Sequence, residues 1–567
     1  KAPVNFLKSN ELKYVAKDDK FNISLYKYLL FLHCADGIKS GELNLKYSFE
    51  FRSINEYLIP QQEWDKDRDK LLRMAELDEY ANIDSLLSEL KPQLDNKYKE
   101  TNDAIAKNKN SYLSFNTQGR MQIKTPRTDY DEREYIGTTL AQNGYVPIQQ
   151  VLTEINDVCG YSETFTHYAI KHTKMKPTLP AIIAGIIGMG CNIGINKLAS
   201  ISKGVGENSL KNTVNWLFDL PNIQAANNTI VQAINNLSLA KSYQKSDSRI
   251  HSSSDGRKVT VAVDSLMANR SFKYFGKDQG VVIYTFIDER QSLFHSTVIS
   301  ASDREAPYVI DGLLQNEVKQ NTIHSVDEHG FSEAVHAAAH LTGTSFAPRF
   351  KQIGNKCIYA FSNKKTYQRK GYKVLPSGTI NQKLIKKEWD NVLRFMATIK
   401  TGHTSASQLF KRLSSYAKQH PLYKALKEFG KIIKSIYILT YCNDVELRQD
   451  IQKNLNRIEL SNKFSNAVFF DNDQEFKVGT PEEQEVAAAC KVLIQNAVVL
   501  WNYLFLSDML VKIDDKEERQ ELVDTIHKGS VICWRHINLR GTYDFRRKAA
   551  NQPRFNMEEI RQLKIAR

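Results

Sequence analysis

Cysteine is scarce in this sequence, and its spacing excludes two kinds of scaffold. Seven cysteines are scattered through 567 residues, and none form a C-x-x-C pair. An odd, scattered set of this kind indicates neither a disulfide framework nor a zinc ribbon. We therefore expect the chain to work in a reducing compartment.

Nucleotide-binding and hydrolase signatures are also absent. The sequence contains no G-x-x-x-x-G-K-[ST] loop and no G-x-S-x-G elbow, so neither ATP-driven chemistry nor that type of serine hydrolase is indicated. His336 and His340 lie one helical turn apart, but the residues between them are alanines and include no Glu. We predict no nucleotide cofactor and interpret the pair as partly buried histidines.

Long apolar runs are missing as well. The most apolar stretch, residues 179–195, is interrupted by four glycines and is shorter than the ~20 residues that cross a bilayer. We predict that this stretch is buried and that the protein has no membrane partner.

Positive charge is in excess. The chain has 78 Lys and Arg against 64 Asp and Glu, a net charge of +14, which favours a polyanionic partner, with nucleic acid as the first candidate. With 41% hydrophobic and 10% aromatic residues it can form packed cores. Its length indicates several domains or one elaborated catalytic core.

Hydrophobic periodicity divides the chain into helical and mixed regions. Up to about residue 245 the pattern is mostly helical. Pro92 is expected to interrupt the helical pattern of 64–110, and residues 119–131 are expected to form a polar loop or linker. After residue 249, β-branched and aromatic runs predict strands at 259–263, 281–287, 294–299, 322–326 and 346–350. Helical patterns at 306–314 and 332–341 alternate with the later strands, which predicts a mixed sheet flanked by helices.

Helical patterns return at 381–460 and 484–512. Such an order is typical of a long helical insertion into an α/β unit. The last 33 residues hold nine Lys or Arg and three acidic residues, so the C-terminus is locally basic.

Acidic residues in the mixed region are candidates for metal-dependent chemistry. Two-metal phosphoryl transfer requires carboxylates from separate elements, and the candidates are Asp255, Asp264, Asp288, Asp327 and Glu459. The Asp-Gly pair at 255–256 also fits an ordinary turn. Asp327 stands where a strand meets a loop, as functional residues or helix N-caps do. Glu459 flanks an apolar helical stripe, facing either a cleft or solvent.

Several segments match one protein family in order and spacing. They include Ser-Ser-Asp-Gly at 253–256, Val-Asp-Glu-His-Gly at 326–330 and Arg-Ile-Glu at 457–459, with further matches at 145–147, 190–194, 280–286, 305–316, 346–349, 496–502 and 536–543. In these segments the chain resembles the replicative DDE transposases of the Tn-three family of bacterial transposons. The resemblance extends over nearly the whole chain.

The resemblance implies the fold class and the catalytic residues. It predicts a mixed, mostly helical multidomain protein with an RNase H-like α/β catalytic core carrying a helical insertion. The family's acidic triad carries over to Asp255, Asp327 and Glu459, separated by 72 and 132 residues. These residues are expected to bind two Mg²⁺ ions, with Mn²⁺ able to substitute. Because Ile458 stands where the family usually has glycine, the fallback candidates for the third carboxylate are Glu482, Glu483 and Glu485.

The expected organisation has six parts. They are an N-terminal helical segment (1–118), a helical scaffold for DNA holding and dimerisation (119–248), the RNase H-like core with both Asp residues (249–362), the helical insertion (363–450), a helical completion of the core with Glu459 (451–515) and a basic C-terminal segment (516–567).

The function implied is nicking of the 3′ ends of a transposon and joining of those ends to target DNA, which forms a cointegrate. The expected partners are double-stranded DNA, as inverted-repeat ends and target, and a second copy of the chain in a homodimer. The expected DNA contacts are His329, Arg349, Arg535, Arg540, Arg546 and Arg547. The family also implies a cytoplasmic, nucleoid-associated bacterial protein, and end-recognition modules N-terminal to this chain.

Two alternatives stay open at this point. One is a metal-dependent RNase H-like nuclease that cuts DNA without strand transfer. The other is an architectural DNA-binding protein in which the acidic residues are structural.

Overall fold

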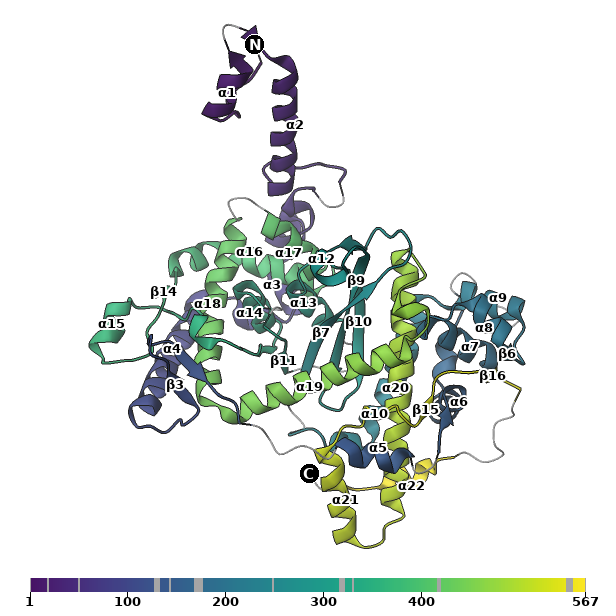
Figure 1. Cartoon of the computed structure of the whole chain (residues 1–567). Coiled ribbons are helices and arrows are strands. Elements are labelled where there is room, and N and C mark those ends of the chain that lie inside the picture. Colours follow the sequence, from purple (N-terminus) through teal and green to yellow (C-terminus); the bar gives the residue numbers. More distant parts are fainter. Residues whose placement is uncertain are drawn as a thin grey trace.

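The computed structural model describes residues 2–17, 20–48, 51–126, 133–141, 144–167, 177–246, 249–315, 322–328, 331–415, 420–546 and 554–565. Helices predominate, and the largest sheet lies at the centre of the body (Figure 1). The mostly helical, mixed architecture that the sequence predicts is therefore observed.

The central sheet has six strands and mixed direction. Its order is β10-β9-β7-β11-β12, and β8 pairs with β9. β9 runs antiparallel to both β7 and β10, whereas β11 runs parallel to both β7 and β12. The strands are β7 (His251–Thr260), β8 (Asn269–Arg270), β9 (Gln279–Asp288), β10 (Leu293–Ser300), β11 (Ile323–Ser325) and β12 (Ser345–Phe346).

Strand β7 begins earlier than its β-branched residues suggest. The turn interpretation of the Asp-Gly pair is wrong, because Asp255 and Gly256 lie inside β7 and pair with Thr285 and Tyr284 of β9. On its other edge, β7 pairs with β11 only from His251 to Ser253. Beyond Ser253 this edge has no strand partner among the described residues until Thr260, whose carbonyl accepts the Phe476 NH, so Asp255 lies where β7 and β11 diverge.

Helices cover both faces of the sheet. On one face, Gly312 of α13 (Ala306–Leu314) lies directly against the Phe286 ring, and α14 (Glu333–Leu341) packs beside α13. On the other face lie α19 (Val445–Val468) and α20 (Pro481–Val511), whose contacts with β7 and β10 bury apolar residues such as Val259, Ile283 and Ala488. The result is a three-layer α/β unit.

The longest helix, α20, is apolar enough in length and composition to cross a membrane. Its apolar window is entirely buried inside the protein, where it packs against α7 (Leu179–Gly190), α10 (Leu220–Asn236) and β10. Burial in the core accounts for its apolar composition. The prediction that 179–195 is buried is also confirmed, since most of α7 is inaccessible.

The N-terminal half is helical, with two departures from the predicted pattern. Pro92 lies inside α4 (Ile83–Ala106) rather than ending a helix, and burial of Leu90 and Leu94 on either side holds the helix together. At the start of the polar loop predicted at 119–131, β4 (Met121–Ile123) pairs with β3 (Leu113–Phe115) in a hairpin, and residues 127–131 of that loop lie outside the described residues. Helices α1 (Ser9–Val15) and α2 (Ile23–Ser40) project from the body (Figure 1).

Four helices, α15 to α18, separate β12 from α19 in the sequence. α16 packs on α3 and α18 packs on α4, and α18 also lies along α14. The Asp311 carboxylate of α13 accepts hydrogen bonds from the backbone NH groups of Ala406 and Ser407, at the start of α17. These bonds connect α17 to a helix that packs on the central sheet. The bounds are α3 (Gln61–Met74), α15 (Lys364–Arg369), α16 (Gln382–Lys400), α17 (Ala406–Ser415) and α18 (Pro421–Asn443).

The C-terminal segment returns to the N-terminal half. β15 (Ile537–Asn538) pairs parallel with β5 (Val146–Pro147), and β16 (Tyr543–Asp544) pairs parallel with β6 (Ser202–Lys203). The remaining elements are α5 (Arg133–Ala141), α6 (Ile148–Cys159), α8 (Ile195–Ile201), α9 (Glu207–Leu217), α11 (Ser238–Lys241), α12 (Phe272–Phe275), α21 (Lys516–Lys528), α22 (Met557–Gln562), β1 (Ala16–Lys17), β2 (Lys20–Phe21), β13 (Tyr359–Ala360) and β14 (Gly378–Thr379).

Candidate functional site

Asp255 points from β7 toward helix α19. Its carboxylate accepts a hydrogen bond from Asn462 Nδ2 at 2.9 Å. Its neighbours on the same face also contact α19, because alternate residues of a strand share a face: Ser253 Oγ donates to the Asn454 carbonyl at 3.0 Å, and Arg257 Nη1 donates to Ser465 Oγ at 3.0 Å. These three hydrogen bonds hold α19 along the strand that carries Asp255.

The opposite face of β7 holds a buried network of hydroxyl groups. Ser252 and Ser254 each bond one ring nitrogen of His324 at 2.8 Å, and Ser254 also bonds the Tyr284 hydroxyl at 2.8 Å. Burial lowers the pKa of His324 to about 3, so the ring is neutral. This network, which the sequence patterns do not reveal, fixes β7 against β11 and β9.

Asp327 follows the end of β11, at the strand-to-loop position that the sequence predicts. Arg349 Nη2 contacts its carboxylate at 3.1 Å and Lys351 Nζ does so at 3.2 Å. Arg349 Nη1 also donates to Gln452 Oε1 of α19 at 2.9 Å. Desolvation alone raises the pKa of Asp327, but the backbone NH of Glu328 and the Arg349 and Lys351 contacts together hold it below its usual value.

Glu459 lies on α19 and its side chain is exposed. The apolar stripe beside it, including Leu455 and Ile458, is buried, so Glu459 lies on the solvent flank of the helix. Its charge nevertheless acts on Asp255.

The fallback carboxylates have other surroundings. Glu485 accepts hydrogen bonds from Thr297 Oγ1 and from the Val298 NH of β10, at 2.9 and 2.8 Å, and burial raises its pKa to about 7. Glu482 and Glu483 lie in the first turn of α20, where Thr480 bonds Glu483.

Asp255 experiences several negative charges at once. Its pKa is raised to about 6, chiefly by burial and next by the charge of Glu305, with Asp327 and Glu459 adding to the effect while the Gly256 NH opposes it. The charges of the other two carboxylates predicted from the sequence, Asp327 and Glu459, therefore both act on Asp255. Glu305 joins them, although no motif reasoning marks it as a site residue.

The donor chemistry suits a divalent cation. Carboxylate oxygens are the ligands that Mg²⁺ prefers, and the half-buried Asp255, on which other negative charges act, gains from a nearby cation. Among the described residues, however, no group of three or more His, Cys, Asp or Glu stands close enough together to hold a metal ion. In this structure the Asp327 carboxylate is paired with Arg349 and Lys351.

The histidine pair on α14 has apolar and aromatic surroundings. His336 is completely buried, more than the sequence predicts, and both of its ring nitrogens lack a hydrogen-bond partner. His340 packs edge-on against Tyr80, with ring centroids 5.7 Å apart.

The predicted DNA-contact residues lie in different places. Arg349 is at Asp327. Arg540 is exposed and stacks over the Phe470 ring at 4.8 Å, just beyond the end of α19. Arg535 is exposed, and Arg546 pairs with Asp544 at 2.7 Å beside β6, outside the carboxylate set. His329 and Arg547 lie outside the described residues.

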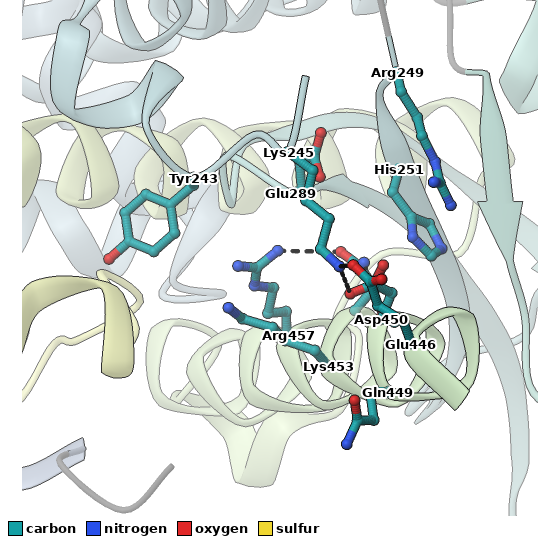
Figure 2. Close-up of a pocket in the computed structure, with 11 residues that line it drawn as sticks. Tyr243, Lys245, Arg249, His251, Glu289, Glu446, Gln449, Asp450, Lys453 and Arg457 are labelled. Atoms are coloured by element: carbon teal, nitrogen blue, oxygen red, sulfur yellow. Dashed lines mark hydrogen bonds and ion pairs between the residues drawn. The ribbon is translucent and has the colours of Figure 1, made fainter. Parts of the chain in front are cut away.

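A charged cavity of about 160 Å³ lies on another flank of α19, beside the start of β7 (Figure 2). Lys245 bridges Glu446 and Asp450 at 2.6 and 2.8 Å. Burial and the nearby charge of Arg457 lower the pKa of Lys453 to about 8. These ion pairs connect the segment before β7 to α19. They therefore stabilise the position of the helix that carries Glu459.

Comparisons with known proteins agree on one family. Residues 150–543 match the Tn3 transposase DDE domain. The chain is 26% identical to the transposase for transposon Tn1546 of Enterococcus faecium, over 100% of this chain and 56% of the relative. It is 28% identical to the transposases for Tn2501 of Escherichia coli and Tn501 of Pseudomonas aeruginosa, in each case over 96% of this chain and 54% of the relative. The chain thus spans about half the length of these relatives.

Proposed function

The chain belongs to the Tn3 family of DDE transposases, and from that membership we propose that it cuts and joins DNA strands. In this proposal it nicks the 3′ ends of a transposon and transfers them to target DNA, which gives the cointegrate of replicative transposition. The observation that supports the proposal is that the charges of Asp327 and Glu459 both act on Asp255, which lies where β7 and β11 diverge. Functional residues of α/β sheets concentrate at such positions.

The proposed site uses divalent metal ions, as the DDE family implies. Asp255, Asp327 and Glu459 would hold two Mg²⁺ ions, with Mn²⁺ able to substitute. Bound there, such ions supply activation of the attacking oxygen and stabilisation of the leaving oxygen.

The chain's own groups prepare this set of carboxylates. Asn462 and the Gly256 NH orient Asp255 and stabilise its ionised form. Arg349 and Lys351 hold Asp327 until ligands arrive. Because Arg and Lys are general phosphate contacts, we propose that both side chains turn to the DNA backbone when Asp327 is released.

The organisation proposed for the whole chain follows the family. The family implies an RNase H-like core, which we assign to 249–362 and 451–515, with 363–450 as its helical insertion. The segments 1–118, 119–248 and 516–567 would hold DNA and the second copy of a homodimer. His329, Arg535, Arg540, Arg546 and Arg547 complete the proposed DNA contacts, and we place the protein at the bacterial nucleoid.

A strand-transfer assay tests the proposal. A pre-nicked transposon-end oligonucleotide with a free 3′-OH is incubated with a supercoiled target and Mg²⁺. We expect joined product with the unaltered chain and a loss of at least about 100-fold in Asp255→Ala, Asp327→Ala and Glu459→Ala. Glu518→Ala, which removes an exposed carboxylate on α21, is the matched control and should retain joining.

Each other outcome has a definite meaning. Retained joining in Glu459→Ala alone would move the third carboxylate to the 482–485 group. Metal-dependent cutting without joining would favour the nuclease alternative. DNA binding with neither reaction, in a chain extended to the full length of its relatives, would favour the architectural alternative.

A further inference from the structure

The segment that connects β7 to β9 exposes large apolar side chains. Residues 262–278, the β7–β9 arm, include β8 and α12 and directly precede β9 (Figure 1). The structure describes the whole arm, and none of its residues is buried. Leu266 is 96% exposed, Phe272 is 86% exposed and Tyr274 is 47% exposed. Single exposed apolar residues are ordinary on a protein surface, but a group of them on one short arm indicates a contact surface.

The base of the arm is fixed to the central sheet. Asn269 Nδ2 donates hydrogen bonds to Ser300 Oγ and to Ser302 Oγ, both at 3.0 Å. Phe275 packs on Gly280 of β9, where an added Cβ atom would lie 2.5 Å from Phe275 Cζ. Because the arm is anchored in this way, its exposed rings are held at the surface while a neighbouring ring is used for packing.

Basic side chains flank the exposed rings. Lys258 Nζ lies 4.2 Å from the centre of the Tyr274 ring, and Lys273 Nζ lies 4.9 Å from it. Between residues 258 and 278, four cationic side chains stand against two acidic ones: Lys258, Arg270, Lys273 and Lys277 against Asp264 and Asp278. Cations that contact phosphates, alternating with rings that stack on bases, are how proteins bind single-stranded nucleic acid. The chemistry of the arm therefore fits DNA better than an uncharged apolar partner.

The arm continues the strand that carries Asp255. Thr260, the last residue of β7, is five residues after Asp255. A strand rises about 3.3 Å per residue, so the arm begins about 17 Å from Asp255. One nucleotide of a DNA strand spans about 3.4 Å. A strand held at Asp255 and running along β7 reaches the arm after about five nucleotides.

We propose that the β7–β9 arm binds unpaired DNA bases, with Phe272 and Tyr274 stacking on the bases and the basic side chains contacting the phosphates. The inference rests on the proposed function, because it concerns DNA bound at the same core. Within a continuous duplex each base is covered by its neighbours, so an exposed ring finds a free base face only at a bulge, a gap or an end. Nicking and joining of strands produce DNA of this kind.

Binding of bulged DNA, measured in EDTA and without turnover, tests this inference. A duplex with a short bulge that contains 2-aminopurine is titrated with the full chain, and 2-aminopurine fluorescence and the anisotropy of an end label are followed. We expect the unaltered chain to quench the fluorescence by stacking. Phe272→Ala should lose the quenching and bind the bulged DNA about tenfold more weakly, whereas its binding to the fully paired duplex should be almost unchanged.

Two further substitutions at the same position separate stacking from apolar contact. Phe272→Trp keeps an aromatic face and should quench and bind as the unaltered chain does. Phe272→Leu keeps an apolar side chain without a ring and should behave as Phe272→Ala does. Leu266→Ala is the matched control, because it removes an exposed apolar side chain of the same arm that has no ring, and it should leave both readouts unchanged. Thermal unfolding shows that each variant is folded.

The outcomes separate this inference from the proposed function. If folded Phe272→Leu or Phe272→Ala quenches and binds as the unaltered chain does, stacking by the arm is overturned, whatever the strand-transfer assay shows. If Phe272→Ala instead alters the sedimentation of the chain and leaves DNA binding intact, the arm is a protein contact and the inference is overturned. If the unaltered chain binds neither DNA, the DNA partner of the proposed function is wrong, and the inference falls with it.

Discussion

At the scale of one residue, the fold makes the ionised form of the Asp255 carboxyl group unfavourable. It is largely withdrawn from water and lies near Glu305, Asp327 and Glu459, so the folded chain resists its ionisation. In the unfolded chain the same carboxyl group titrates near its ordinary value of 3.8. Folding is therefore opposed by the ionised form of Asp255.

This difference gives a prediction about stability. Because the pKa is about 6 in the folded chain, the favourable contribution of protonated Asp255 is fully present below pH 3.8 and is lost as the pH rises through 6. Without metal, Asp255→Asn should be more stable than the unaltered chain at pH 8, by about 2 kcal/mol. The gain should vanish near pH 4. Urea denaturation at both pH values measures it, and an equal gain at both would mean that charge is not the cause.

Sequence reasoning found the triad candidates but not their surroundings. Asp327 was predicted at a strand end because the β-branched residues before it mark the strand. Asp255 resembles a turn residue because serine and glycine are poor strand formers. Its strand conformation depends on pairing with β9 and on the His324 and Tyr284 hydrogen bonds, which are tertiary contacts. The position of Glu305 beside β7 could not be predicted, since it depends on contact with a glycine 49 positions earlier in the chain.

At the scale of elements, most helices and strands follow from periodicity. α13, α14, β9 and β10 lie within a few residues of their predicted limits. The strand predicted at 346–350 is wrong beyond Phe346, because the backbone of Ala347 and Arg349 bonds to residues around β11 without continuing a regular ladder. Short pairings of this kind depend on tertiary neighbours and leave no repeating pattern in the sequence.

One helix crossing gives a prediction at this scale. α18 approaches α14 so closely that a Cβ atom at Gly430 would overlap the backbone of Glu333, 2.6 Å from its carbonyl carbon. Gly430→Ala should therefore destabilise the chain by roughly 1–3 kcal/mol, seen as a lower urea midpoint. Gly206→Ala is the control, because that site has open space and an ordinary φ of −79°. Equal effects of the two changes would contradict a close crossing.

At the scale of the whole molecule, the net charge of +14 favours binding to a polyanion such as DNA. Each phosphate contact made by Lys or Arg contributes to the salt dependence of DNA binding. Arg540 is exposed and contacts an aromatic ring, whereas Arg546 is already paired with Asp544.

The two arginines should therefore differ in a binding experiment. Arg540→Ala should lower the slope of log K against log salt concentration by about 1, and Arg546→Ala should change it much less. Fluorescence anisotropy with a DNA duplex at several salt concentrations measures both slopes. A larger change in Arg546→Ala would mean that the Asp544 pair opens for DNA and that Arg540 is not a contact.

The pairings of β15 with β5 and of β16 with β6 also bear on how the chain is made. Synthesis proceeds from the N-terminus, and domains begin to fold as they emerge from the ribosome. β5 and β6 therefore stay unpaired until β15 and β16, which end at residue 544, have been translated. A chain that terminates early, after Glu459, carries every acidic residue of the candidate site but leaves both strands unpaired. Exposed, incompletely packed segments are where proteases cut, so we expect a chain that ends early to be degraded.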